Sequence, residues 1–237
     1  VWALRKMGGL ERWSQFRRQW FVEDARGALV LLAIWPVGLL FPLEVPLGLG
    51  QVVARASDAL AAWDVPQEVL AWLPERLAEG AVMAPLTEVV SVALGGLAPV
   101  LMLYAVLRSK VRRPLGLCLV LLAGLSVTAL SQTLSFGPAR AWAWWHAPVA
   151  WGVGVAAGLG VLALVLPARA CAVMALLALA VNLTLLNPAP TSAYLAHNLQ
   201  TWEQGQFIRF NGLAEWIGWL WPFVTLFYLA VRVSKRN

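Results

Sequence analysis

The sequence predicts an all-α, polytopic integral membrane helix bundle with about six transmembrane helices, both termini in the cytoplasm and amphipathic helices at the membrane surface. Of the 237 residues, 60% are apolar and 13% are charged, and the mean hydropathy is +0.71. A water-soluble domain cannot cover its surface with so few charged residues. The composition therefore excludes soluble enzymes, disordered tails and nucleic-acid-binding domains, so we expect no nucleic-acid partner.

Residues 1–26 predict a basic amphipathic helix on the cytoplasmic face of the membrane. Aromatic side chains lie near one helical stripe with arginines beside it: Trp13, Phe16, Trp20 and Phe21, then Arg12, Arg17 and Arg18. The charge favours contact with anionic lipid, and the simpler alternative is an anchor that also sets topology. The first residue is Val1 rather than Met, so we expect a processed start or a missing upstream segment, and not a cleaved signal peptide.

Six apolar stretches are long enough, or nearly so, to cross the hydrocarbon, which takes roughly 20 residues. They form a predicted six-span bundle over residues 27–237 and contain no Lys, Arg, Asp or Glu: Gly27 to Leu43, Val89 to Leu107, Pro114 to Leu134, Ala147 to Leu166, Ala170 to Leu186 and Trp216 to Val231. The first and the last are short, and they contain Pro36 and Pro222. We therefore expect kinks or tilts in these two spans.

The charges between the spans set the predicted orientation. With a cytoplasmic N-terminus, the inner segments hold 14 of the 18 basic residues and the outer segments keep only Arg55, Arg76, Arg140 and Arg209. The inner acidic residues are Glu11, Glu23 and Asp24. This distribution follows the positive-inside rule at every short loop.

Two longer segments fall on the predicted outer side. Residues 44–84 contain several prolines and predict a helical cap made of two short surface helices, Leu47 to Trp63 and Pro66 to Ala78. The outer loop 187–212 opens with turn-forming residues and predicts a helix from about Ser192 to Gln204. Most tryptophans of the chain lie in or beside the outer segments, as in an interfacial aromatic belt: Trp63, Trp72, Trp142, Trp144, Trp145, Trp202, Trp216, Trp219 and Trp221.

Small residues in the fourth span predict close helix packing. They recur four apart in two series, Gly154 with Gly158, and Gly152 with Ala156 and Gly160. We expect this face to contact a helix of the same chain, with a partner protein as the alternative. Thr128 and Asn182 are predicted to form hydrogen bonds between helices. No internal repeat is present, so the inverted-repeat architecture of many transporters has no support. The short chain and an interior without acidic residues disfavour a transporter.

Polar residues at the outer ends of the spans form a candidate site. They are Glu88, Gln132, Arg140, His146, His197, Glu203, Arg209 and Glu215. Carboxylates near hydrocarbon are costly unless they are paired, so each marks a candidate site, although Glu88 and Glu215 also suit helix N-termini. The arginines either pair with these carboxylates or bind a lipid phosphate. The histidines lack metal-ligand spacing, and Cys118 and Cys171 lie in apolar runs as small buried residues, so we expect no metal and no cofactor.

Three segments carry a resemblance to a known family. They are Leu199 to Phe223 (LQTWEQGQFIRFNGLAEWIGWLWPF), Thr133 to Trp144 (TLSFGPARAWAW) and Trp20 to Leu32 (WFVEDARGALVLL). Together they resemble VanZ-like bacterial membrane proteins, in the C-terminal helical bundle of long members, whereas the core motif of the VanZ domain itself is not found. The resemblance implies a multi-pass bacterial inner-membrane protein, an upstream VanZ domain and a role of the glycopeptide-resistance type.

The sequence contains no catalytic signature, and catalytic residues are unknown. The first functional hypothesis is a non-catalytic inner-membrane protein or accessory subunit of the cell envelope, whose partners are membrane lipids and other integral membrane subunits. The alternative is an outward-facing site that binds or acts on a lipid-linked envelope intermediate. In that site Glu88, Glu203 and Glu215 serve as acids or bases, and Arg140 and Arg209 hold phosphate.

Overall fold

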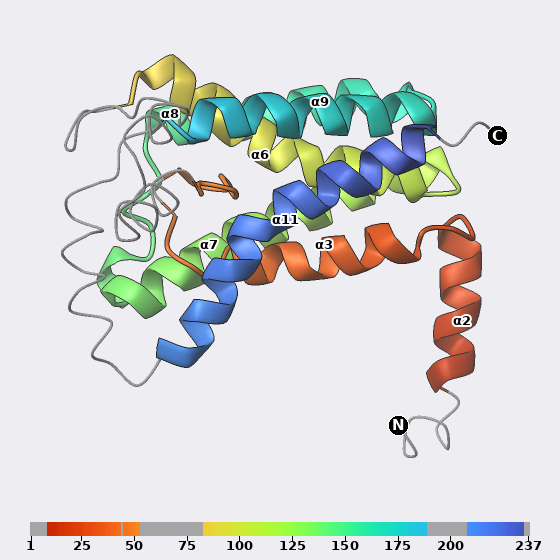
Figure 1. Cartoon of the computed structure of the whole chain (residues 1–237), viewed down its shortest axis with the longest axis horizontal. Coiled ribbons are helices and arrows are strands. Elements are labelled where there is room, and N and C mark those ends of the chain that lie inside the picture. The colour runs from red at the N-terminus through yellow and green to blue at the C-terminus, as the bar shows by residue number, and fades with distance from the viewer. Residues whose placement is uncertain (1–8, 44, 53–82, 189–207, 235–237) are drawn as a thin grey trace, which may run out of the picture.

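The computed structural model describes residues 9–43, 45–52, 83–188 and 208–234, which form an all-α bundle. Its seven α-helices in the described residues are α2 (Gly9–Trp20), α3 (Arg26–Gly38), α6 (Pro85–Val106), α7 (Arg113–Phe136), α8 (Ala147–Leu162), α9 (Ala168–Leu186) and α11 (Ile208–Ser234). Three short 3-10 turns, η1 (Lys110–Arg112), η2 (Pro138–Arg140) and η3 (Ala163–Val165), join them. Figure 1 shows α2 at one end, crosswise to the other helices, which form the bundle.

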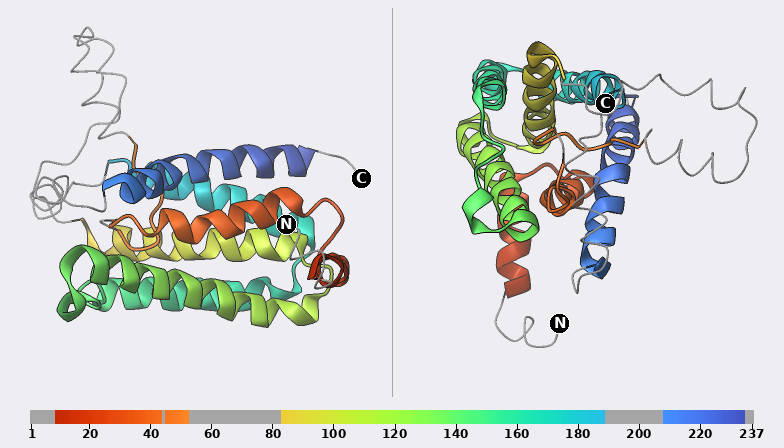
Figure 2. Two further views of the ribbon diagram at one scale, coloured as in Figure 1. Left: turned by 90° about the horizontal axis from the view of Figure 1, so that it is seen from below. Right: turned by 90° about the vertical axis from the view of Figure 1, so that its left-hand side faces the viewer.

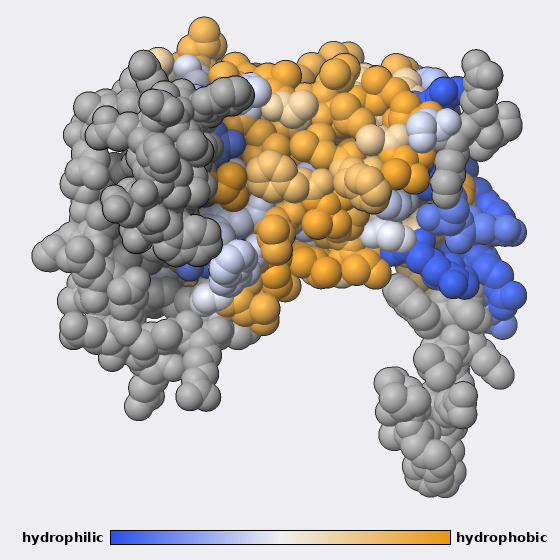
Figure 3. All heavy atoms as spheres, viewed as in Figure 1, coloured by the Kyte–Doolittle hydropathy of each residue, from blue (hydrophilic) through white to orange (hydrophobic). Residues whose placement is uncertain are grey.

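Five of these helices have the length and composition to cross a membrane. They comprise α6, α7 with η1, α8 with η3, α9, and the part of α11 from Gly212 to Ser234, with lengths of 19 to 27 residues. Hydrophobic side chains cover the middle of the bundle in Figure 3, as expected for a surface in contact with lipid. The chain is therefore a helical integral membrane protein, which confirms the predicted fold class at this level.

The first predicted span differs from the other five. Its helix, α3, has 13 residues, which at 1.5 Å per residue gives a length of about 20 Å, less than the roughly 30 Å of the hydrocarbon core. The chain continues from α3 as an irregular segment that stays buried from Val45 to Gly50. The predicted span from Gly27 to Leu43 is thus a short helix followed by non-helical chain.

Helix α6 is the central element of the bundle. It is the most buried of the five long helices, and it packs against α9, α8, α7 and α3, while α11 packs against α3 and α9. The end-on view in Figure 2 shows this arrangement. Gly95, Gly96 and Ala98 of α6 are buried and let its neighbours approach closely.

A buried strap, Val45 to Gly50, is inserted between the helices of the bundle. Leu47 fills a space lined by glycines: its carbonyl oxygen would lie 2.5 Å from a β-carbon on Gly95, and its side chain 3.0 Å from one on Gly124. Leu49 lies in the same way between Gly38 and Gly218. Irregular backbone at membrane depth is tolerated where protein surrounds it, and here α3, α6, α7, α9 and α11 do so.

The strap replaces the beginning of a predicted surface helix. Residues 47–52 are not helical, and Leu47 to Gly50 are buried, so the predicted helix from Leu47 is wrong at its start. Leu47 has φ 64° and Gly50 has φ 104°, and both values are incompatible with a right-handed helix. The rest of that helix, the helix at 66–78 and the helix at 192–204 lie outside the described residues.

The two ends of the bundle differ in chemistry. The basic end consists of α2, the α6–α7 and α8–α9 connections and the end of α11, and hydrophilic residues gather there in Figure 3. The aromatic end consists of the starts of α6, α8 and α11, the end of α9, and η2 with the tryptophans after it. Helix α11 begins at Ile208, within the predicted outer loop 187–212, so the last span is longer than predicted.

The two small-residue series on α8 have different environments. Gly152, Ala156 and Gly160 are buried, and a β-carbon on Gly152 would lie 2.7 Å from Val92 of α6. Gly154 and Gly158 are exposed, and nothing described lies within 4 Å of their β-carbon positions. Side chains two residues apart on an α-helix point in directions about 200° apart, so the two series lie on different faces of α8. The predicted contact within the chain is correct for the first series only.

Candidate functional site

One pair from the predicted outer site is in direct contact at the aromatic end. His146 Nε2 lies 3.2 Å from Glu88 Oε1. Glu88 belongs to the first turn of α6, and His146 is the residue that precedes α8. The contact arises because α6 and α8 pack together with their N-termini at the same end of the bundle.

Two helix N-termini meet at this pair. The carboxylate lies by the N-terminus of its own helix and opposite the N-terminus of α8, and both helix dipoles present their positive ends there. The Glu88 side chain is 16% exposed and the His146 side chain is 49% exposed, so the imidazole is the part that water reaches. The contact is an ion pair when His146 is protonated and a hydrogen bond when it is neutral.

The other predicted site residues are less completely described. Arg140 is exposed on η2, Glu215 is partly buried on α11, and each makes a polar contact. His197 and Glu203 lie outside the described residues, and Arg209 lies in α11 with its side chain outside them. The structure therefore brings Glu88 and His146 together and leaves the wider cluster a prediction.

Tryptophans surround the aromatic end, as predicted for an interfacial belt. Trp142 and Trp145 are 60% and 42% exposed, whereas Trp144 is buried between them and donates from Nε1 to the Ala141 carbonyl at 2.8 Å. Trp216 of α11 is 59% exposed at the same end. Partly exposed indoles with one polar atom suit the headgroup level of a bilayer.

A buried arginine organises the basic end. Arg113 is 2% exposed, and its Nη1 donates to the carbonyls of Leu164 and Leu166, each at 2.7 Å. Its Nη2 donates to the Tyr104 carbonyl at 3.1 Å. These acceptors belong to the C-terminal ends of α6 and of α8 with η3, where helix dipoles favour a cation. Arg113 therefore joins two helix ends without a carboxylate partner in the described residues.

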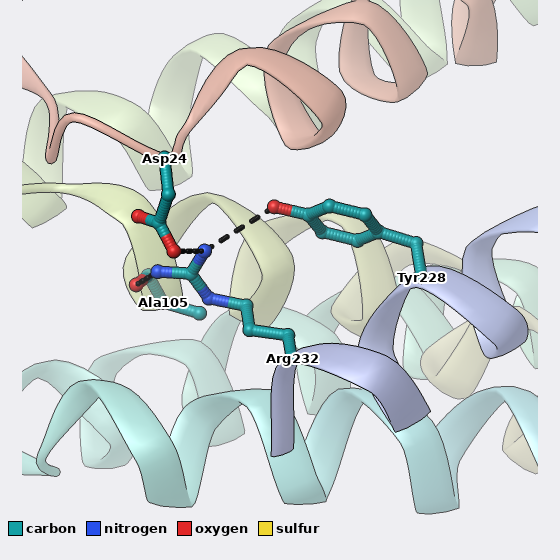
Figure 4. A network of polar contacts seen from close by, with 4 residues as sticks. All are labelled: Asp24, Ala105, Tyr228 and Arg232. Atoms are coloured by element: carbon teal, nitrogen blue, oxygen red, sulfur yellow. Dashed lines mark hydrogen bonds and ion pairs between the residues drawn. The ribbon is translucent and has the colours of Figure 1, made fainter. Parts of the chain in front are cut away.

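The last four carbonyls of α6 all have donors, which a buried helix end requires. Leu103 accepts from the Leu107 amide, Tyr104 from Arg113, Ala105 from Arg232 and Val106 from the Val22 amide, at distances of 3.0 to 3.2 Å. Arg232 of α11 also pairs with Asp24 at 2.8 Å and donates to the Tyr228 hydroxyl at 3.3 Å, as Figure 4 shows. This network fixes α3, α6 and α11 to one another.

Several polar atoms are buried without a hydrogen-bond partner in the described part of the chain. Two are Thr128 Oγ1 and Asn182 Oδ1, so the interhelical hydrogen bond predicted for Thr128 is not formed, and Asn182 makes none through its oxygen. Trp35 Nε1, Ser91 Oγ and Thr225 Oγ1 share this condition. Side-chain oxygens of Ser, Thr and Asn cost less than charges when buried, which allows the bundle to retain them.

The two cysteines lie in different environments. Cys171 is buried as predicted, whereas Cys118 is exposed on the apolar face of α7, so its predicted burial is wrong. A thiol facing lipid loses little, because it behaves as a small apolar group. Among the described residues no group of three or more His, Cys, Asp or Glu side chains is placed to hold a metal ion.

Comparisons with models of known protein families, with curated proteins and with solved structures find no significant match for this chain.

Proposed function

We propose that this protein is a non-catalytic, multi-pass protein of the bacterial inner membrane, with both termini in the cytoplasm. It acts there as an accessory subunit that contacts lipids and other membrane helices. The concentration of basic side chains at one end supports the orientation, because positive residues favour the cytoplasmic side. The basic end then faces the cytoplasm, and the aromatic end faces outward.

The exposed face of α8 carries the proposal. Gly154 and Gly158 leave open space on this face, next to Trp151, which is 70% exposed. A small-residue notch on a membrane helix lets a second helix approach closely, and van der Waals packing then stabilises the contact. The opposite face of α8 is already filled by α6 and α7, so the open face is available to another chain.

The test is gentle extraction from native membranes followed by mass spectrometry of the intact assembly. We expect a stoichiometric membrane subunit that is lost in Gly154→Ile and in Gly158→Ile. A β-carbon added at either glycine meets no atom of the described residues within 4 Å. The matched control is Leu159→Phe, which adds bulk on α8 about 100° or more away from both glycines. A lone monomer without bound lipid, or equal partner recovery from all variants, contradicts the proposal.

The contact between Glu88 and His146 favours a second candidate, an outward-facing site for a lipid-linked envelope intermediate of the VanZ-like type. The exposed imidazole offers a hydrogen-bond donor to a phosphate, and Arg140, on η2 in the connection between α7 and α8, offers a cationic one. Its test is photocrosslinking with a polyprenyl phosphate probe, together with glycopeptide susceptibility, in cells that carry His146→Gln or Glu88→Gln. Unchanged labelling and susceptibility in both variants contradict this candidate.

A further inference from the structure

A cluster of cations forms a basic shelf at the basic end. We define the shelf by Arg17, Arg26, Arg108, Lys110 and Arg112, which come from α2, the start of α3 and the connection between α6 and α7. Main-chain hydrogen bonds hold these segments together: the Arg108 amide donates to the Trp20 carbonyl at 2.9 Å, and the Val22 amide donates to Val106 at 3.0 Å. The shelf is therefore a fixed surface.

The charges of the shelf are not neutralised by carboxylates in the described residues. Arg112 donates to the Gln19 carbonyl and Lys110 to the Val165 carbonyl, and a neutral acceptor satisfies the donor while the positive charge remains. The side chains of Arg17, Arg26 and Arg108 have no partner that the described residues supply. The carboxylates described at this end are Glu23, which is exposed, and Asp24, which pairs with Arg232.

The shelf also lies at the level where lipid headgroups meet the bundle. In Figure 1, α2 lies at the basic end of the bundle, where it runs crosswise to α3 and extends away from the other helices. On α2, Phe16 is 38% exposed and stacks on Trp20 with centroids 4.9 Å apart, and the Arg112 guanidinium lies 4.4 Å from the Trp20 ring centroid. Aromatic rings beside cations are typical of helices that lie in the membrane interface.

We propose that the basic shelf is a binding surface for the phosphate headgroups of anionic phospholipids. Exposed guanidinium N–H groups donate to the phosphate oxygens, and the aromatic pair on α2 contacts the upper part of the acyl chains. The proposal rests on the proposed function in one respect, the orientation that places the shelf at the cytoplasmic leaflet. Binding of the headgroups to the shelf requires neither that orientation nor a partner subunit.

The experiment uses the full, delipidated chain in detergent, titrated with phosphatidylglycerol or phosphatidylcholine and followed by native mass spectrometry. We expect the wild type to prefer phosphatidylglycerol, with a preference that falls as salt rises. Each cation near an anionic headgroup changes affinity by about fivefold, so Arg17→Gln with Arg108→Gln is expected to weaken phosphatidylglycerol binding about 25-fold. Neither side chain has a partner in the described residues, so the double variant keeps the contacts of the fold.

The matched control is the charge-keeping pair Arg17→Lys with Arg108→Lys, because it retains both positive charges at the same two positions of the shelf. It is expected to bind phosphatidylglycerol like the wild type. Equal affinity of the wild type for both lipids overturns the proposal, as does a preference retained in the double glutamine variant or lost equally in the control. If the double glutamine variant unfolds, Arg26→Gln alone tests the same surface. Equal recovery of the partner subunit from the wild type and the α8 variants, with intact lipid selectivity, would contradict the proposed function and leave the lipid-binding proposal unaffected.

Discussion

The guanidinium of Arg113 lies beside the ring of Tyr104, 5.1 Å from its centroid, while Nη2 donates to the carbonyl of the same tyrosine at 3.1 Å. The Tyr104 hydroxyl in turn donates to the Gly160 carbonyl at 3.3 Å. Two side chains thus satisfy carbonyls at the ends of α6 and α8. A charge buried among neutral acceptors is stable only while all of these contacts persist.

Replacing Arg113 with Met is expected to destabilise the bundle strongly. The change removes hydrogen bonds to several buried carbonyls and leaves them unpaired, at a cost of about 3 kcal/mol. Thermal unfolding in detergent measures this loss. Arg169→Gln is the control, because Arg169 is exposed and donates one hydrogen bond, to the Val233 carbonyl at 3.3 Å. A similar loss of stability in both variants would contradict the role of Arg113 in joining the two helix ends.

Gly95→Ala is expected to lower the midpoint of unfolding by the equivalent of about 1 to 3 kcal/mol, because the added methyl group would lie 2.5 Å from the Leu47 carbonyl oxygen. The matched control is Gly154→Ala, whose methyl group meets nothing described within 4 Å. Alanine has the higher helix propensity, so the control is expected to be neutral or slightly stabilising. Equal destabilisation of both variants would show that the strap does not fill the glycine-lined space.

Leu47 offers a test of both packing and backbone conformation. Leu47→Ala removes a fully buried side chain and is expected to cost about 2 to 5 kcal/mol. Leu47 has φ 64°, a region that glycine adopts without steric penalty, so Leu47→Gly is expected to be no less stable than Leu47→Ala. Denaturant unfolding of the pair decides this, and a clearly less stable glycine variant would contradict the left-handed conformation.

Asp24 and Arg232 are expected to contribute unequally. The Asp24 side chain is 68% exposed, so Asp24→Asn is expected to cost about 0.5 kcal/mol or less. Arg232 is 18% exposed and also donates to the Ala105 carbonyl at 3.2 Å, so Arg232→Met is expected to cost about 2 kcal/mol. A double-mutant cycle in detergent measures the interaction free energy of the pair. Equal losses of stability in the two single variants would show that the ion pair, and not the Ala105 contact, carries the energy.

Site-specific labelling tests the proposed orientation. Single cysteines are introduced at Ala139 of the aromatic end and at Ser234 of the basic end, in a chain without Cys118 and Cys171. We expect a membrane-impermeant maleimide to label Ala139→Cys in intact cells and Ser234→Cys only after permeabilisation. The reverse pattern would invert the topology and move the basic shelf to the outer leaflet.

The membrane spans were predictable because each depends on a local property, the length of an apolar run. Helix α6 begins at Pro85 and α7 at Arg113, within a few residues of the predicted bounds. The strap was not predictable in this way, since Leu49 and the residues after it also fit a helical repeat. Its conformation depends on Gly95 and Gly124, which lie far along the chain.

The candidate site shows the same division between local and long-range information. Glu88 could be predicted as a candidate site residue from the sequence, because a carboxylate near hydrocarbon is costly to bury. Its contact with His146 could not be predicted, because that contact depends on the packing of α6 against α8. Arg113 was recognised only as one of many cytoplasmic charges. Its position beside Pro114, at the start of a span and at the edge of the hydrocarbon, is the one signal that separates it from the others.

The strap also constrains the order in which the chain is assembled in the membrane. Its seat uses residues made much later in synthesis, Leu183 and Leu186 of α9 and Gly218 and Pro222 of α11. A chain folds from its N-terminus as it is synthesised, so α3 and the strap are made before α9 and α11. The space that the strap fills is therefore incomplete until the last helix is inserted, so the strap reaches its buried position only after that helix is in place.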